Sequence, residues 1–186
     1  MQPITASKLR SDIEALSEDK YFQVPSVVKL HRFFPLCPPL PCMTFHHTRS
    51  PAPDAPTPPH TPTNLPSPGD PADVFPPDNT RYAHLTFRRA GAPEACAHGF
   101  AGYFKTWLYG DVVLSTVPED HTPEMYSWFP IFFPLKTPVV VPAGADLELH
   151  MWRCCGPQSV WYEWAVGGAL GSEIHNAKGK SYAIGL

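Results

Sequence analysis

Aromatic side chains are concentrated in one short segment, PEMYSWFPIFFPLK, which runs from Pro123 to Lys136. Its three prolines oppose a helix, so its aromatic residues either fill a β core or are presented to a ligand on a loop. In the second role, one of them offers a flat face to a flat ligand. Composition alone favours the other alternative, burial of Trp128 in the core.

Histidine and cysteine are numerous enough to suggest a metal site, with nine His and five Cys. Cys37 and Cys42 are too far apart for a Cys-x-x-Cys pair. The Cys154-Cys155 and His46-His47 pairs are adjacent, so in a strand their side chains point to opposite faces. Because no spacing matches a structural zinc site, the sequence predicts no metal site.

Catalytic and nucleotide-binding patterns are not recognisable either. The chain has no Gly-x-Ser-x-Gly elbow and no Cys/His signature. The glycine cluster Gly167–Gly171 fits no phosphate-binding loop and is predicted to form a turn. Glu163, which lies among large apolar residues, is expected to face outward or to pair with an arginine. The residues alone therefore predict no catalytic centre and no bound cofactor.

Length and charge limit the remaining possibilities. The chain has 186 residues, enough for one domain, and a formal net charge of −3. This near-balance predicts no attraction for nucleic acid or acidic membranes, and no apolar run is long enough to span a bilayer. The opening MQPITASKLRSD lacks the apolar core of a secretory signal, and five cysteines cannot all pair. These features favour a reduced, intracellular compartment.

Short strands bounded by proline and glycine dominate the predicted elements. One amphipathic helix is expected over about residues 6–17, with Leu9, Ile13 and Leu16 on one face. Residues 48–79 form a predicted loop insertion, since 11 of the 27 residues from Pro51 to Pro77 are prolines. Strands are expected over residues 24–34, 41–46, 81–89, 98–109, 111–116, 128–133, 139–141, 146–155, 159–166 and 180–186.

This pattern predicts a mainly β fold, an antiparallel barrel or sandwich of about nine strands with one short N-terminal helix and the long Pro-rich loop. A single domain, residues 1–186, is expected. Leu147, Leu149 and Met151 alternate with Glu148, His150 and Trp152, so the first three are expected to face the core. Gly99 and Gly102 predict a bulge or a close backbone approach within the strand after His98.

Several blocks of the chain resemble one known family. They are HGFAGYFKTWLYGDVVLST, HTPEMYSWFPIFFPLKTPVVVPAG, WYEWAV and the terminal IHNAKGKSYAIGL. Together they closely resemble the C-terminal β-barrel and oligomerisation domain of the type II, symmetric-dimethylating protein arginine methyltransferases, which include arginine methyltransferase number five of animals. The resemblance covers nearly the whole chain except the Pro-rich insertion.

The resemblance implies a role within a larger enzyme. In that family a separate Rossmann half binds S-adenosylmethionine and supplies two glutamates, and the barrel half closes the arginine site and aids homo-oligomerisation. By resemblance, Trp128 stacks on the substrate guanidinium, and Ser127 leaves room beside it; a simple turn or capping hydroxyl is the alternative for Ser127. Lys105 replaces an acid of animal relatives, which puts a charge role there in doubt.

The resemblance further implies substrates, location and limits. Arginine-containing proteins are the implied substrates, namely Gly/Arg-rich tails, histones and splicing proteins, and the implied location is the cytoplasm and nucleus. The cofactor-binding half has no counterpart in this chain, so alone it is expected neither to bind S-adenosylmethionine nor to methylate. The alternative is a non-catalytic interaction or oligomerisation module derived from the same domain. A third hypothesis is that the Pro-rich loop recruits an SH3- or WW-type partner.

Overall fold

Antiparallel strands make up most of the structure, a computed structural model that describes residues 1–6, 23–27, 33–45, 79–125 and 127–185. The strands are β1 (Gln2–Ala6), β2 (Ser26–Val27), β3 (Phe33–Pro35), β4 (Arg81–Phe87), β5 (Ala95–Gly102), β6 (Lys105–Tyr109), β7 (Val112–Ser115), β8 (Ile131–Val141), β9 (Leu147–Cys155), β10 (Ser159–Val166) and β11 (Ile184–Gly185). The short 3-10 helices are η2 (Pro118–Asp120), η3 (Gly168–Leu170) and η4 (Ala177–Gly179). The mainly β prediction is confirmed.

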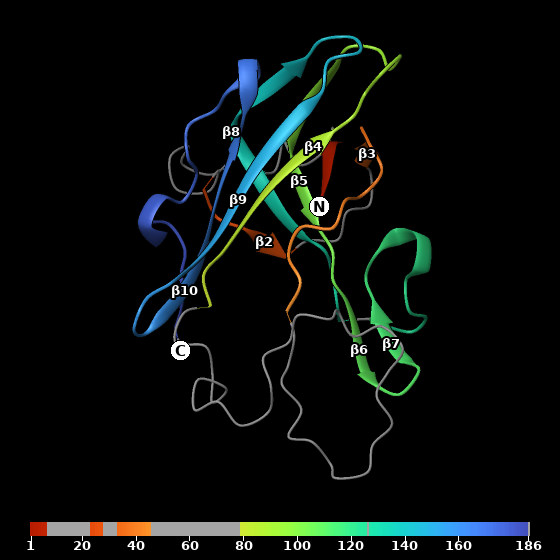
Figure 1. Ribbon diagram of the computed structural model, residues 1–186, viewed down its shortest axis with the longest axis vertical. Coiled ribbons are helices and arrows are strands. Elements are labelled where there is room, and N and C mark those ends of the chain that lie inside the picture. Colours follow the sequence, from red (N-terminus) through yellow and green to blue (C-terminus); the bar gives the residue numbers. More distant parts are fainter. Residues whose placement is uncertain (7–22, 28–32, 46–78, 126, 186) are drawn as a thin grey trace, which may run out of the picture.

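Three sheets contain these strands. One has the order β2-β8-β5-β1-β3, the second β11-β10-β9-β4, and the third is the β6-β7 hairpin. In Figure 1 the hairpin projects to one side, below the two larger sheets. The described strands thus form a sandwich-like arrangement with a projecting hairpin rather than one closed barrel.

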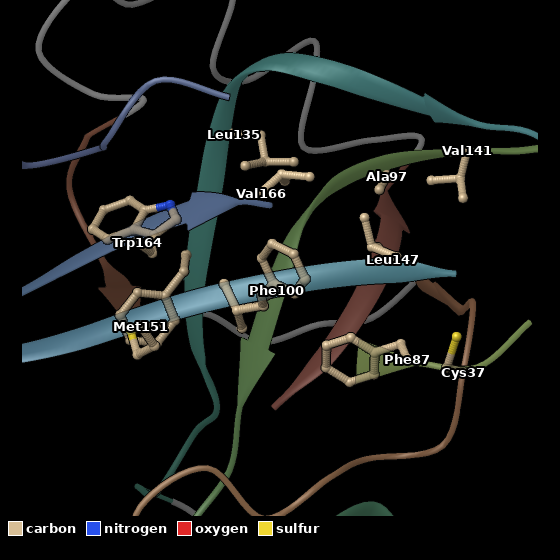
Figure 2. Packing of buried hydrophobic residues seen from close by; sticks show 12 residues of the cluster. Cys37, Phe87, Ala97, Phe100, Leu135, Val141, Leu147, Met151, Trp164 and Val166 are labelled. Carbon is tan, nitrogen blue, oxygen red and sulfur yellow. The ribbon is translucent and has the colours of Figure 1, made fainter. Parts of the chain in front are cut away.

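The hydrophobic core lies between the two larger sheets. Figure 2 shows side chains from both sheets converging there. The five-stranded sheet contributes Ala97, Phe100, Phe133, Leu135 and Val141, and the four-stranded sheet contributes Phe87, Leu147, Leu149, Met151, Trp164 and Val166. The alternation predicted for β9 is confirmed, because Leu147, Leu149 and Met151 are all buried. Burial on this scale drives the two sheets together, at roughly 1.5–3 kcal/mol for each large side chain.

Strand β8 has core residues on both of its faces. Phe133 joins the main core, whereas Phe132 packs with Ala101 in a second cluster that Phe33 and Tyr103 cover. The aromatic segment after Trp128 is therefore mostly structural, as the first alternative proposed. The predicted strand at residues 128–133 begins later, at Ile131, and the separate strand predicted at 139–141 is the end of the same strand.

Two internal prolines do not interrupt β8, contrary to the sequence prediction. Pro134 pairs with Gly99, next to a register shift between Ala97 and Gly99 in β5. Because regular pairing stops at this irregularity, the missing N–H groups of Pro134 and Pro138 cost little. The predicted bulge and close approach at Gly99 are confirmed, since a Cβ there would lie 2.4 Å from the carbonyl oxygen of Phe133.

Other predicted boundaries were wrong in detail. The strand predicted over residues 98–109 divides into β5 and β6, and the one predicted over 24–34 contains β2 and the start of β3, with 28–32 outside the described residues. Residues 41–45 form no strand, and Pro41 at the start of this segment lacks the donor that a ladder needs. The first strand, β1, was not predicted. The predicted helix, apart from Ala6, and nearly all of the Pro-rich insertion lie outside the described residues.

Among the described residues, no helix is long and apolar enough to cross a membrane.

Candidate functional site

Trp128 lies on the segment that connects the β6-β7 hairpin to β8. The residue is 54% exposed, although Phe132 and Phe133, a few residues later, are buried. Tryptophan is usually well buried, so half-exposure of this indole needs a reason. The alternative that Trp128 fills the core is therefore wrong, and its ring is accessible to a ligand.

Phe104 supports one side of the indole. The two ring centroids are 5.2 Å apart and the ring planes are tilted by 55°, a favourable aromatic geometry. Phe104 occupies the junction of β5 and β6, and Thr116 fixes its backbone on both sides. The Phe104 N–H donates to Oγ1 of Thr116 at 3.0 Å, and the Thr116 N–H donates to the Phe104 carbonyl at 2.9 Å. The indole thus rests on an ordered platform.

The same junction is held by a partly buried tyrosine hydroxyl. Tyr103 donates its hydroxyl to Oε1 of Gln2 at 2.8 Å, and Nε2 of Gln2 donates to the Cys37 carbonyl. Burial, followed by the nearby Glu119 carboxylate, raises the pKa of Tyr103 to about 12. The phenol therefore stays protonated and remains a donor throughout the physiological range.

Asp120 anchors the loop that leads to Trp128. Its carboxylate accepts hydrogen bonds from Lys105 and, at 2.5 Å, from the Ser115 hydroxyl. The hydrogen bond from Lys105 is the largest cause that lowers the pKa of Asp120, and the one from Ser115 lowers it further. Thr122 adds two contacts to Ser115, since its N–H donates to the Ser115 carbonyl and its hydroxyl accepts from the Ser115 N–H. Lys105, whose role the sequence left in doubt, therefore forms an ion pair that joins the start of β6 to this loop.

A shallow depression of about 320 Å³ opens beside the indole. It is lined by Leu114, Glu124, Met125, Ser127 and Trp128. Ser127 is exposed in the turn before Trp128, and Tyr126 lies outside the described residues. Glu124 adopts a left-handed backbone conformation with φ of 60°, which is unfavourable for a residue with a Cβ. An aromatic face and a carboxylate beside one depression suit a planar cation.

Sequence reasoning identified Trp128 and Ser127 but missed two neighbours. Phe104 belongs to the HGFAGYF block, and only the fold brings it against Trp128. Glu124 offered a weak signal, since an acid directly after Pro123 is typical of a turn. The glycine cluster forms the turn η3, as predicted. Glu163 accepts hydrogen bonds from the Trp161 indole and the Lys178 N–H, and no arginine of the described residues forms an ion pair with it.

Comparison with known proteins gives one consistent result. Residues 1–184 match the family model described as the PRMT5 oligomerisation domain. The whole chain aligns with protein arginine N-methyltransferase 5 of rice at 44% identity over 187 residues, which are 25% of that protein. The corresponding protein of Xenopus laevis is 42% identical over 191 residues, 26% of its length. The protein arginine N-methyltransferase skb1 of fission yeast is 39% identical over 58% of this chain. The chain thus spans about a quarter of the length of its full-length matches.

Proposed function

The chain belongs to the PRMT5 oligomerisation-domain family, and we propose that it forms one wall of the substrate-arginine site of a protein arginine methyltransferase. The complete enzyme would transfer methyl groups from S-adenosylmethionine to protein arginines, giving monomethyl and symmetric dimethyl products. The observation that carries this proposal is the half-exposed indole of Trp128, supported by Phe104 beside the depression. The proposed substrates are arginine-containing proteins, namely Gly/Arg-rich tails, histones and splicing proteins.

The indole would act by stacking on the guanidinium of the target arginine. A guanidinium is planar and weakly hydrated, and its attraction to an indole face contributes about 0.5–2 kcal/mol. Stacking fixes the plane of the guanidinium, so that one nitrogen faces the methyl donor bound by the other half of the enzyme. Ser127, a small exposed residue before the indole, leaves space beside the guanidinium. Because the chain's own residues provide only this wall, we propose that the isolated chain neither binds S-adenosylmethionine nor methylates.

A chimeric enzyme tests this role. The corresponding quarter of the rice relative is replaced by this chain, and methylation of a Gly/Arg-rich peptide is measured with Trp128 or with Ala in its place. Loss of about 0.5–2 kcal/mol of stacking predicts a kcat/KM that is lower by about two- to thirtyfold. Tyr182→Ala, which removes another exposed aromatic ring, is the control and should leave the rate unchanged. Equal rates for Trp128→Ala and the unmodified chimera would refute the proposal.

Calorimetry on the isolated chain tests the proposal that it does not bind S-adenosylmethionine by itself. Titration with S-adenosylmethionine is expected to give no heat of binding, because the chain lacks a phosphate-type cradle and an acidic ribose ligand in any recognised pattern. Stoichiometric binding would contradict the proposal that the other half of the enzyme holds the cofactor.

Fluorescent tagging of the complete protein would test the proposed cytoplasmic and nuclear location.

Oligomer formation is the second part of the proposed function, and the β6-β7 hairpin is its best candidate surface. Four large apolar side chains are exposed there: Trp107 at 67%, Leu108 at 58%, Tyr109 at 79% and Val112 at 50%. Exposed apolar residues grouped on one short element mark an association surface. We propose that a second copy of the complete protein covers this hairpin. The same surface could serve the non-catalytic module that is the alternative function.

The oligomer is tested by replacing Tyr109 with Lys in the complete protein and measuring its mass by analytical ultracentrifugation. A charge in a desolvated apolar contact shifts the equilibrium towards smaller species. Val140→Lys, on an exposed apolar residue of β8, is the matched control. An unchanged mass for Tyr109→Lys, or the same loss in both variants, would place the contact elsewhere.

A further inference from the structure

Three potential metal ligands lie together on the outer face of the four-stranded sheet. On β4, Ala83 faces the core, so His84 faces outward; on β9, Leu149 faces the core, so Glu148 and His150 face outward. His84 is the direct antiparallel partner of His150. Residues at positions i and i+2 of one strand and a third on the neighbouring strand therefore share one face.

The side chains of these residues already approach one another. Nε2 of His84 lies 3.1 Å from Oε2 of Glu148. The imidazoles of His84 and His150 stack with centroids 4.4 Å apart and an interplanar angle of 5°. One ligand atom from each of the three residues lies within 4.8 Å of the others. Ligands of one tetrahedral zinc ion are about 3.3 Å apart. Side-chain rotations that shorten the longest of these separations by about 1.5 Å therefore bring the three atoms to coordinating distance.

Tyr82 holds the His150 ring from the side. Its hydroxyl lies 2.7 Å from Nδ1 of His150, and its ring stacks on Trp152 with centroids 5.4 Å apart. With Nδ1 engaged, Nε2 is the atom of His150 available to a metal. A hydrogen bond to the non-ligating nitrogen is the usual outer-shell feature of a metal-binding histidine, since it fixes tautomer and orientation.

Gly167 lets the backbone approach two of the ligands closely. A Cβ built on Gly167 would lie 2.4 Å from Nε2 of His150 and 3.1 Å from Oε2 of Glu148. The backbone of Gly167 is held there by its N–H, which donates to the Glu148 carbonyl at 3.0 Å. Nε2 of His150 and Oε2 of Glu148 thus lie against a backbone position that only a residue without a side chain can occupy.

We propose that His84, Glu148 and His150 bind one divalent transition-metal ion of the zinc class. Two imidazole nitrogens and one carboxylate oxygen match the ligand preferences of Zn²⁺, and the solvent-exposed side provides the fourth position. The ion joins β4, the edge strand of this sheet, to β9. The sequence predicted no metal site because that prediction used only the spacing of residues along the chain. Pairing between strands brings together residues whose spacing gives no such signal.

Calorimetric titration of the 186-residue chain with Zn²⁺, under reducing conditions, is the primary test. One Zn²⁺ per chain is expected, and this binding is lost or weakened at least tenfold in His84→Gln, Glu148→Gln and His150→Gln. Cobalt(II) in place of zinc gives visible absorption bands that report imidazole and carboxylate ligands without thiolate. His121→Gln, which changes an exposed histidine outside the cluster, should bind like the unmodified chain.

The adjacent thiols of Cys154 and Cys155 at the end of β9 are the competing ligands, and both are free of disulfides. A Cys154→Ser/Cys155→Ser double variant is therefore titrated in parallel and should retain the site. Gly167→Ala keeps all three ligand residues but places a Cβ 2.4 Å from Nε2 of His150, which must then move, so it should weaken binding with an unchanged circular dichroism spectrum. The proposal is overturned by absence of saturable Zn²⁺ binding, by binding that survives Glu148→Gln and His150→Gln, or by loss of binding only in the cysteine variant.

Discussion

Phe104 and Trp128 are in contact although the whole β6-β7 hairpin lies between them along the chain, with their ring centroids 5.2 Å apart. Phe104 comes from the β5-β6 junction and Trp128 from the segment before β8. Thr116 fixes the backbone of the first through two hydrogen bonds, one from its N–H and one to its hydroxyl. Asp120 and Thr122 fix the loop that leads to the second. A half-exposed indole is thereby kept in place without being buried.

The aromatic contact should be measurable as a coupling free energy. In a double-mutant cycle with Phe104→Leu and Trp128→Leu, the two single variants should each lower the free energy of unfolding, and their sum should exceed the loss in the double variant by about 0.5–1.5 kcal/mol. Urea unfolding monitored by circular dichroism provides the four values. Strict additivity would show that the rings contribute no mutual stabilisation. Tyr182→Leu combined with Trp128→Leu serves as the uncoupled control pair.

Gly99 should not tolerate a side chain. In Gly99→Ala the new Cβ would lie 2.4 Å from the Phe133 carbonyl oxygen and 2.6 Å from the Phe132 ring. Because the first of these atoms is backbone, β5 and β8 must separate, and we expect a loss of about 1–3 kcal/mol in the free energy of unfolding. Gly185→Ala is the control, since nothing lies within 4 Å of a Cβ built there. Equal denaturation midpoints for the two variants would contradict the tight approach seen at the bulge.

Asn176 fastens the C-terminal segment to β10. It is fully buried, and its Nδ2 donates to the carbonyls of Tyr162 and Tyr182 at 2.9 and 2.8 Å. Its Oδ1 accepts from the N–H groups of Ser181 and Tyr182, both at 3.0 Å. Both N–H donors of the Asn176 amide and its oxygen are thus hydrogen-bonded to backbone groups.

Asn176→Asp is therefore expected to be strongly destabilising. The substitution keeps the shape but places a carboxylate oxygen against two carbonyls, and leaving buried charged and polar groups unsatisfied costs about 2–4 kcal/mol. Thermal unfolding measured by calorimetry checks the loss. Asn79→Asp is the matched control, because Asn79 contributes its backbone carbonyl to Arg153. A wild-type melting temperature for Asn176→Asp would show that this network contributes little.

The regular strands were the part of the fold that sequence could predict. In β4 and β9 the apolar residues alternate with polar ones, and the period of two is enough to assign Ala83, Leu147 and Leu149 to the core. The bulge at Gly99 was also predictable, because a glycine inside a strand pattern often marks a bulge or a close backbone approach. Strand β8 was not, since its prolines are tolerated only because the partner strand breaks register opposite them.

The candidate site was predictable only in part. The Ser127-Trp128 step was identified through family resemblance, whereas composition favoured burial of the indole. The exposed indole of Trp128 is supported by its contact with Phe104, and pairing between β4 and β9 places Glu148 beside His84. Both relationships depend on tertiary structure, so neither produces a periodicity or a residue spacing that can be read from a single sequence.

His175 should make the stability of the domain depend on pH. The residue is buried and stacks on Trp164; its Nε2 accepts the Lys136 N–H at 3.0 Å, and its Nδ1 bonds the Trp164 carbonyl at 3.1 Å. This arrangement requires the neutral imidazole with the proton on Nδ1. Burial lowers the pKa of His175 from its ordinary value of 6.5, although the hydrogen bond to Trp164 and the nearby Glu173 carboxylate oppose the shift.

The sign of the effect follows from proton binding. Because the pKa of His175 is lower in the folded state, the unfolded chain binds more protons at pH values below about 6.5. The contribution of neutral His175 to the free energy of unfolding is therefore complete above about pH 6.5 and declines as the pH falls through the lowered pKa. Urea unfolding at about pH 7.5 and about pH 5.5, on either side of the ordinary histidine pKa, should show a drop in the free energy of unfolding. His175→Gln should be less stable overall but show a smaller drop, whereas His121→Gln should keep the full drop. An identical pH dependence in His175→Gln and the unmodified chain would mean that another group is responsible.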